Sequence, residues 1–590
     1  GDTRIHRPDL VLLGLRADEH PRLAASVGGP RAAVVADHSQ LAGRGPCRGF
    51  QSQGPAQHPE PVSLAESFHD FAHAHRARAG TTRATRTAGS TGPVEPARAT
   101  RTAHPNFQSD AGGKSMSVVT QTSPRSGRLP EAVLLGLALF SGLSAYCLVH
   151  LGVGESGLPP SFPQIFLVTV LTTAGAHIAV RRFAPYADPV FFPAALALNG
   201  LGLAMIYRVD IAEETDHASN QLLLSFVAIA LMVGTVIVLR NHRTLRRFTW
   251  TSLIAGIVLL LLPMVPGLGR TINGARIWIN IGMSFQPAEL AKICFAVFFA
   301  GYLVTERDNL SLAGPKFLGI RWPKARHFIP ILAAWAACMA VLVMEKDFGT
   351  AILFFGLFVG MLYVATERVS WIAIGGLLAA LGVAVIVSQV SHVQARFTVW
   401  LHALDPDVYD SAHGSFQLVQ GLFGMASGGL FGTGLGQGYP NKVYAASSDF
   451  IIASFAEEIG LIGLLALLCI YLIIVVRGLR TAVVLRDGFG KLLVTGIAFT
   501  VAIQCFVVVG GVTRLIPLTG LAMPFLAHGG SALMTNWIII GLLLRISDSA
   551  RRPATADPLP SDDFLKTIPE LEKDSSSNKN DALETQVVKL

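Results

Sequence analysis

Twelve apolar segments, each long enough to cross a lipid bilayer as a helix, constrain the fold of this chain more than any other feature. Apolar residues make up 51% of the sequence and charged residues only 15%, a balance typical of polytopic membrane proteins. We therefore expect an all-α membrane domain of about twelve transmembrane helices. The expected spans are residues 131–153, 162–180, 189–207, 220–239, 248–267, 285–304, 328–344, 349–366, 370–390, 450–476, 491–512 and 530–546.

The distribution of basic residues predicts the orientation of these spans. If the N-terminus is cytoplasmic, the five inner connections carry 16 lysine and arginine residues, whereas the six outer connections carry 7. Basic residues favour the cytoplasmic side, so we expect both termini to lie inside. The net charge of +8 reflects largely the contact of inner loops with anionic membrane lipids, and we expect no nucleic-acid partner.

The two ends of the chain differ in composition from its middle. Residues 1–115 are rich in Arg, Ala, His, Pro and Gly and show no sustained apolar period. We expect residues 1–129 to form a disordered extension, and we interpret Met116 as a candidate native start. The membrane domain is expected at residues 130–550, followed by a disordered cytoplasmic tail at residues 551–590.

Three outer connections stand out by length or composition. Residues 391–449, between the ninth and tenth spans, form a large extracellular loop, and loops of this length in compact proteins are usually functional. Residues 268–284 form a second outer loop with the sequence GRTINGARIWINIGMSF. The prolines in residues 513–529 predict a broken or re-entrant segment.

Asp449 lies where the large outer loop meets the tenth span. Its carboxylate can cap the first helical turn together with Ser447 and Ser448. It can instead act as a general base at the outer membrane surface, where it would take a proton from an attacking hydroxyl group. Glu345 and Asp347, at another outer helix end, are candidate caps for the same reason.

Glu457 and Glu458 follow Asp449 by about two helical turns, roughly 12 Å along a helix. This spacing predicts that both lie inside the bilayer, where carboxylates usually face a cavity or a partner. They point to different sides of the helix, so we expect one to line a polar cavity and the other to face a partner helix. Glu457 is the candidate for contacting substrate.

Gln286, Glu289 and Lys292 follow a three-residue spacing in SFQPAELAKI, which places them along one stripe of a helix. Glu289 and Lys292 could form a buried ion pair that ties helices together. Alternatively, the stripe could line a substrate cavity in which Lys292 attracts an anionic headgroup. The sequence alone leaves both interpretations open.

Trp278 lies at the outer interface, where tryptophan usually anchors a protein in the membrane. Its polar neighbours give it a second possible role, which is stacking on a sugar ring. The outer face carries few basic residues, and these are candidates to bind a phosphate-bearing ligand. They are Arg270, Arg276, Arg396, Lys442 and Arg514.

Several patterns argue against other functions. The glycine-rich run SGGLFGTGLGQG at 427–438 lacks the strand–turn–helix context of a nucleotide loop, and we interpret it as a flexible outer turn. No His/Cys cluster has metal-site spacing, although outer carboxylates could hold a divalent cation such as Mg²⁺ or Mn²⁺. Five of the six cysteines fall within expected spans, so structural disulfides are not expected.

Six motifs, in one order over about 420 residues, resemble the SEDS family (shape, elongation, division and sporulation). They are NGARIWI, FQPAELAKI, EKDFGTAI, GLFGTGLGQG, SSDFIIASFAEEIGLIG and GVTRLIPLTGLAMPFLAHGGSA. Two further segments, HIAVRRFAPYADP and VVVGGVTRLIPLTG, favour the cell-elongation branch of the family over its division branch.

The resemblance implies a peptidoglycan glycosyltransferase that polymerises lipid II at the outer face of the bacterial cytoplasmic membrane. Lipid II is a disaccharide-pentapeptide on undecaprenyl diphosphate. The family's essential aspartate corresponds to Asp449, and the resemblance implies functional roles for Trp278, Glu289 and Lys292. It also implies a class B penicillin-binding transpeptidase as the partner.

The chain departs from the family pattern at two places. His528 stands where relatives usually carry tyrosine, and HGSFQ replaces the common GYQ around Gln417, a further candidate for binding substrate. Two other functions compete with glycosyl transfer. A lipid II flippase would also use carboxylates and a cation inside the membrane, and a secondary transporter would show two related halves, which we do not find.

Overall fold

The computed structural model describes residues 128–553, except 273–274, 281, 283, 312–315, 318–319, 322–324, 390 and 412–413. The expected N-terminal extension and the C-terminal tail therefore lie almost entirely outside the described residues.

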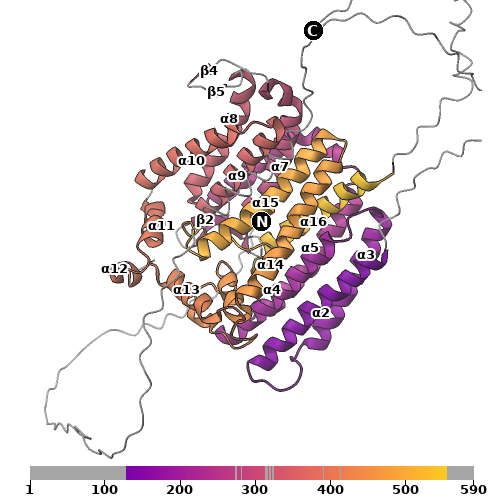
Figure 1. Ribbon diagram of the computed structural model, residues 1–590, viewed down its shortest axis with the longest axis vertical. Helices are drawn as coiled ribbons and strands as arrows, with labels where there is room; N and C mark the ends of the chain where they lie inside the picture. The colour runs from indigo at the N-terminus through magenta and orange to yellow at the C-terminus, as the bar shows by residue number, and fades with distance from the viewer. Residues whose placement is uncertain are drawn as a thin grey trace, which may run out of the picture. The chain divides into compact units, whose positions relative to one another are not determined.

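Ten helices of the described part are long and apolar enough to cross a membrane (Figure 1). They are α2 (Arg128–Gly152), α3 (Phe162–Phe183), α4 (Phe191–Glu213), α5 (His217–Val238), η1 with α6 (His242–Phe248 and Thr249–Leu261), α7 (Pro287–Ser311), α9 (Phe348–Thr366), α14 (Ile451–Val484), α15 (Gly488–Val512) and α16 (Gly530–Arg551). The expectation of a predominantly helical membrane domain is confirmed.

Two further helices coincide with the remaining expected spans. α8 (Ala325–Glu345) and α10 (Ser370–Gln389) have apolar described parts that are shorter than those of the other ten. The count of twelve spans stays a prediction, although a helix occurs at each of the twelve expected positions.

Four helices form the interior of the bundle and the others surround it. In α4, α7, α15 and α16, between 72% and 83% of the most apolar stretch is buried, against 22% in α3. The outer helices expose large apolar side chains such as Phe140, Leu171 and Ile178, as expected where helices face lipid. α2 and α4 are in close backbone contact at Gly142 and Gly200, where a Cβ on Gly142 would lie 2.9 Å from the Gly200 Cα.

The connections between the spans contain strands that the sequence analysis did not predict. Three short strands between α6 and α7 form a small antiparallel sheet, with β1 (Gly269–Ile272) and β3 (Ser284–Phe285) on either side of β2 (Ala275–Asn280). A two-stranded sheet joins β4 (Lys316–Phe317) to β5 (Ile320–Arg321). These short strands are exceptions to the all-α expectation.

The long connection between α10 and α14, which the sequence analysis expects to be the large outer loop, is partly helical and returns to the bundle. It contains α11 (Ser391–Leu401), α12 (Pro406–Tyr409), α13 (Phe416–Gly428) and η3 (Pro440–Lys442). α13 packs against α14, and both are drawn in orange in Figure 1. Residues 513–529, between α15 and α16, form turns without a helix, in agreement with the predicted broken segment.

α14 is interrupted at Gly460, whose φ of 67° and ψ of −175° are not helical. The glycine-rich run fills this break with backbone hydrogen bonds. Thr433 and Gly434 donate N–H groups to the carbonyl oxygens of Glu457 and Glu458, at 2.9 and 3.0 Å. A Cβ on Gly460 would lie 2.3 Å from the Gly432 nitrogen, so only glycine fits there. The glycine-rich run is therefore a packed structural element, and its interpretation as a flexible turn is wrong.

Candidate active site

Asp449 lies two residues before α14, outside the membrane-spanning part of that helix. The residue at the N-cap is Phe450, and the helix start has no side-chain cap. Within the described part of the chain, no hydrogen bond reaches the Asp449 carboxylate. The capping role that the sequence permits is therefore not the one this aspartate has in the structure.

Arg396 on α11 brings a positive charge to the same place. A Cβ on Gly520 would lie 3.6 Å from Asp449 Oδ2 and 3.8 Å from Arg396 Nη2, so both side chains face this glycine. Arg396 Nη1 also donates a hydrogen bond to the Leu518 carbonyl oxygen at 2.9 Å. The guanidinium group thus joins the large outer loop to the 513–529 segment beside Asp449.

Asp347 is the third charged member of this cluster. Its carboxylate caps α9 by accepting hydrogen bonds from the Thr350 backbone and hydroxyl groups, at 3.0 and 2.6 Å, which confirms its predicted capping role. Burial raises the pKa of Asp347, and the Thr350 hydrogen bonds and the nearby Arg396 oppose this rise. Arg396 therefore interacts with two carboxylates, Asp347 and Asp449.

The electrostatics suit Asp449 to proton transfer. Burial raises the pKa of Asp449 above its ordinary value, Arg396 lowers it, and Asp347 raises it further. A carboxylate with a raised pKa binds a proton more readily than an exposed one, which brings its pKa closer to neutral operating pH. The cluster thus holds an uncapped carboxylate beside a cation that favours its ionised form.

Glu289 and Lys292 form a buried ion pair on α7. Lys292 Nζ lies 2.5 Å from Glu289 Oε2 and also donates hydrogen bonds to Gln504 Oε1 on α15 and Asn536 Oδ1 on α16, at 3.0 and 3.5 Å. Gln504 in turn donates to the Ala522 carbonyl oxygen at 2.9 Å. This geometry favours the helix-tying interpretation of the pair, and it links α7 to the 513–529 segment.

We expect Lys292→Met to destabilise the protein by about 3–5 kcal/mol, because it leaves the Glu289 carboxylate buried without its cation. The double variant Glu289→Gln/Lys292→Met should recover a large part of this loss. Denaturant unfolding in detergent measures both effects. Equal destabilisation by the single and double variants would contradict the importance of the ion pair.

Glu457 and Glu458 both anchor the glycine-rich run, but with different partners. Glu458 Oε1 lies 2.9 Å from Arg208 Nε on α4, and its oxygens accept hydrogen bonds from the Gly436 and Gly438 backbone. Glu457 accepts one hydrogen bond from the Tyr439 backbone at 3.1 Å. The expectation that the two do different jobs agrees with this arrangement. The proposed contact of Glu457 with substrate stays a prediction.

These adjacent glutamates make a matched pair for mutation. Glu458→Gln should destabilise the protein by about 1.5–3 kcal/mol, because the buried, charged hydrogen bond between Glu458 and Arg208 is lost. Glu457→Gln should cost less than about 1 kcal/mol, since the amide oxygen of glutamine can still accept from Tyr439. Thermal unfolding of the two variants checks the order, and a reversed order would contradict it.

Three of the other predicted substrate-binding residues bind backbone carbonyl groups in the structure. Arg514 donates to the carbonyl oxygens of Trp400 and Leu401 at 2.8 and 2.9 Å, and Arg276 donates to Val265 at 3.1 Å. The half-buried Gln417 donates to the Tyr444 carbonyl oxygen at 2.7 Å. Trp278 lies in β2 opposite Arg270, and Gln286 is a buried residue directly before α7. Lys442 is exposed and lies over the Tyr439 ring.

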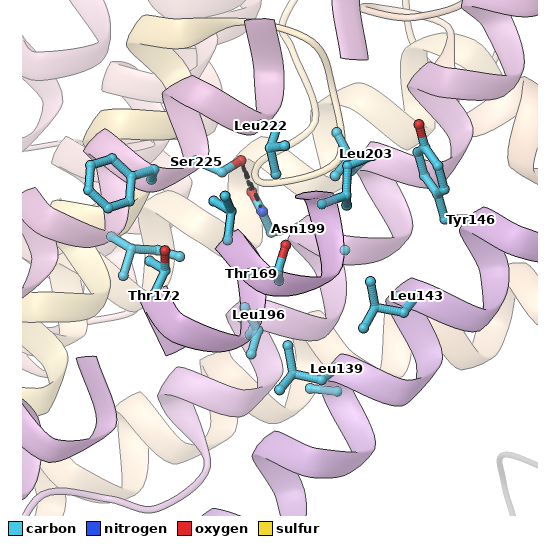
Figure 2. A pocket seen from close by; sticks show the side chains of 17 residues that line it. Leu139, Leu143, Tyr146, Thr169, Thr172, Leu196, Asn199, Leu203, Leu222 and Ser225 are labelled. Atoms are coloured by element: carbon cyan, nitrogen blue, oxygen red, sulfur yellow. Dashed lines mark hydrogen bonds between the residues drawn. The ribbon is translucent and has the colours of Figure 1, made fainter. Parts of the chain in front are cut away.

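Figure 2 shows a cavity between α2, α3, α4 and α5 that contains none of the predicted site residues. Its lining is apolar apart from a few groups, among them Asn199, whose amide donates to the Ser225 hydroxyl at 3.1 Å. Its volume of about 40 Å³ is far below the roughly 300–1,000 Å³ of typical ligand sites. This cavity is too small and too apolar to hold a sugar headgroup.

The described residues contain no group of three or more His, Cys, Asp or Glu side chains that could hold a metal ion. Asp347 and Asp449 interact with Arg396 instead. The sequence analysis permits a divalent cation on outer carboxylates but does not require one, and this possibility stays untested. The five cysteines of the described part are free.

The fold and the charged cluster define an integral membrane protein with a candidate general base at one end of its helical bundle. The family model that describes FtsW, RodA and SpoVE as cell cycle proteins matches residues 189–552. The chain belongs to this family, which is the SEDS family, and the resemblance seen in the sequence is confirmed.

Similar proteins extend this match. The chain is 44% identical over 440 residues to the peptidoglycan glycosyltransferase RodA of Mycobacterium tuberculosis, covering 73% of this chain and 92% of that protein. It is 31% identical over 383 residues to the probable peptidoglycan glycosyltransferase FtsW of Geobacter sp. (strain M18), covering 64% and 100%. A crystal structure of a mutant of the Thermus thermophilus rod shape determining protein RodA matches with a TM-score of 0.44 and 22% identity, covering 62% and 99%.

Proposed function

We propose that this chain is a peptidoglycan glycosyltransferase that polymerises lipid II into glycan strands for cell elongation and shape, with Asp449 as its general base. The activity agrees with the names of its RodA and FtsW relatives. The observation that carries the role of Asp449 is the position of its carboxylate, which caps no helix and lies with the Arg396 guanidinium group beside Gly520.

The reaction needs one proton acceptor. Asp449 takes the proton from the 4-hydroxyl group of the acceptor sugar as that oxygen attacks the donor sugar carbon that bears the diphosphate. The new carbon–oxygen bond forms as the bond to the diphosphate oxygen breaks, and undecaprenyl diphosphate leaves with the bonding electrons. Because the leaving group is already a diphosphate, nearby cations can stabilise its charge without a general acid.

Arg396 has a supporting part in this mechanism. Its charge favours the ionised form of Asp449, and its hydrogen bond to Leu518 fixes the two outer segments in place. Once Asp449 carries the proton, its attraction to Arg396 weakens, so release of the proton to water restores the charged pair.

The proposal places the active site on the extracellular side, with both termini in the cytoplasm. The excess of basic residues in the expected inner connections supports this orientation. A class B penicillin-binding transpeptidase is the proposed partner, which would cross-link the strands that this chain makes. The orientation is tested by replacing the exposed residue Asp407 or the exposed residue Arg247 with cysteine and adding a thiol reagent from outside the cell. Only the cysteine at position 407 should react.

Polymerisation is tested with purified protein, its transpeptidase partner and labelled lipid II. Glycan ladders on a gel are the expected result. The flippase alternative predicts headgroup translocation across a vesicle membrane without polymer, and this result would contradict the proposal. The glycosyltransferase names of the RodA and FtsW relatives do not favour the flippase.

A further inference from the structure

Two histidine rings lie stacked close to the candidate active site. His217 is the first residue of α5, and His528 lies two residues before α16. Their ring centroids are 4.5 Å apart and the ring planes differ by 24°. The rings therefore touch face to face, in an arrangement that neutral imidazoles tolerate and two imidazolium cations do not.

The segment that carries His528 is fastened to the segment that carries Asp449. The His528 backbone N–H donates to the Ser447 carbonyl oxygen at 2.8 Å, two residues before Asp449. Gln221, a buried residue one turn after His217, holds the other side of this segment. Its amide lies 3.3 Å from the Ala527 carbonyl oxygen and 3.4 Å from the Gly529 nitrogen.

Two carboxylates of α4 interact electrostatically with the histidine pair. Asp210 acts on His528, and Glu213 acts on His217. Both carboxylate oxygens of Asp210 are already engaged, one with the Thr215 hydroxyl and one with the Ala218 backbone, each at 2.6 Å. Each ring therefore interacts electrostatically with one α4 carboxylate, but the Asp210 oxygens are held by Thr215 and by the start of α5 and are not free to separate two cations.

We propose that the neutral His217–His528 stack positions Asp449, so that the stack opens when both rings are protonated, frees Ser447 and slows glycosyl transfer. This inference rests on the proposed function. Asp449 is the catalytic residue, and the two histidines are positioning residues that act through the backbone. The effect is an acid-sensitive device at the outer end of the bundle.

The direction of the pH effect follows from the surroundings of His528. Burial lowers the pKa of His528, His217 lowers it further, and Asp210 partly raises it. The stack therefore persists at neutral pH and is lost as pH falls below the ordinary histidine range. Protonation of Asp449 also slows transfer at low pH, so the experiment must separate these two contributions.

The test compares wild type with His528→Phe and His217→Phe, each of which keeps an aromatic ring but cannot acquire a second charge. Hydrogen exchange at the His528 backbone amide, corrected for intrinsic rates, reports its bond to Ser447 directly. In wild type, this exchange should be roughly tenfold faster at about pH 5 than at about pH 7.5. In both phenylalanine variants it should change by less than about twofold.

Polymerisation is measured on the same proteins. The ratio of activity at about pH 5.5 to activity at about pH 7.5 should be at least about threefold higher in the variants than in wild type. His402→Asn is the matched control, because His402 is an exposed outer histidine that pairs with Asp405 at 3.1 Å. It should keep the wild-type ratio.

Two results would overturn the inference: amide exchange in wild type that does not change with pH, or phenylalanine variants that keep the wild-type change. The exchange measurement does not depend on activity. The Asp449→Asn variant should therefore show the same pH dependence of His528 amide exchange as wild type. If Asp449→Asn keeps full polymerisation, the proposed base is wrong, and the histidine pair is still tested by exchange.

Discussion

Asp449→Asn is expected to reduce glycan polymerisation by about 10²- to 10⁴-fold, the usual contribution of a positioned general base. Asparagine keeps the size of the side chain but cannot accept the proton of the acceptor hydroxyl. Because no hydrogen bond within the described residues depends on this carboxylate, we expect folding and partner binding to persist. The measurement is the yield of labelled glycan strands per unit time, with thermal unfolding recorded alongside.

Asp407→Asn provides the control for this experiment. Asp407 is an exposed aspartate of the same outer loop, in α12, so the variant makes the same chemical change away from the charged cluster. It should keep wild-type activity. Strand synthesis at the wild-type rate by Asp449→Asn would exclude this residue as the base.

Arg396→Gln is expected to reduce activity by about 10- to 100-fold at neutral pH and to move the acid limb of the pH profile upward. Arg396 lowers the pKa of Asp449, so its removal raises that pKa and leaves more of the base protonated at a given pH. Activity should therefore be lost at a higher pH than in wild type. Loss of the hydrogen bond to Leu518 adds to the effect at every pH.

Arg396→Lys separates the two roles of the arginine. Lysine keeps the positive charge, so the acid limb should return toward its wild-type position. It lacks the fork of guanidinium donors, so the activity at the optimum should stay below wild type. An acid limb that does not move in Arg396→Gln would contradict the electrostatic role.

The sequence predicts the helices of the membrane domain well because a span has a strong local signal. The expected segments 162–180 and 491–512 correspond to α3 (Phe162–Phe183) and α15 (Gly488–Val512). The capping role of Asp347 is also local, since its partner Thr350 is three residues away. Features that depend on neighbouring residues alone were thus predictable.

Features that depend on distant partners were not. Arg208 was not identified, because its ion pair with Glu458 joins residues 250 positions apart. The same holds for Gln504 and Asn536, which bind Lys292 from two other helices. The sheet of β1–β3 was missed because its strands are short and lie between two apolar spans.

The site was predicted in part. Asp449 and Arg396 were both singled out, and the structure brings them to the same glycine. Their relation was not foreseen, since Arg396 was expected to bind phosphate and instead has carboxylates as its charged neighbours. The predicted anion contacts of Arg276 and Arg514 are untested, and both guanidinium groups bind backbone carbonyls.

The interruption at Gly460 changes which part of the tenth span must cross the lipid. The 24 residues from Leu461 to Val484 would extend about 36 Å, enough to traverse the roughly 30 Å hydrocarbon layer unaided. The preceding stretch from Ile451 to Ile459 then need not cross the hydrocarbon layer and can lie above the acyl chains. Glu457 and Glu458 belong to this stretch, and a position above the acyl chains, unlike the one inside the bilayer that the sequence predicts, would spare their carboxylates most of the penalty that hydrocarbon imposes.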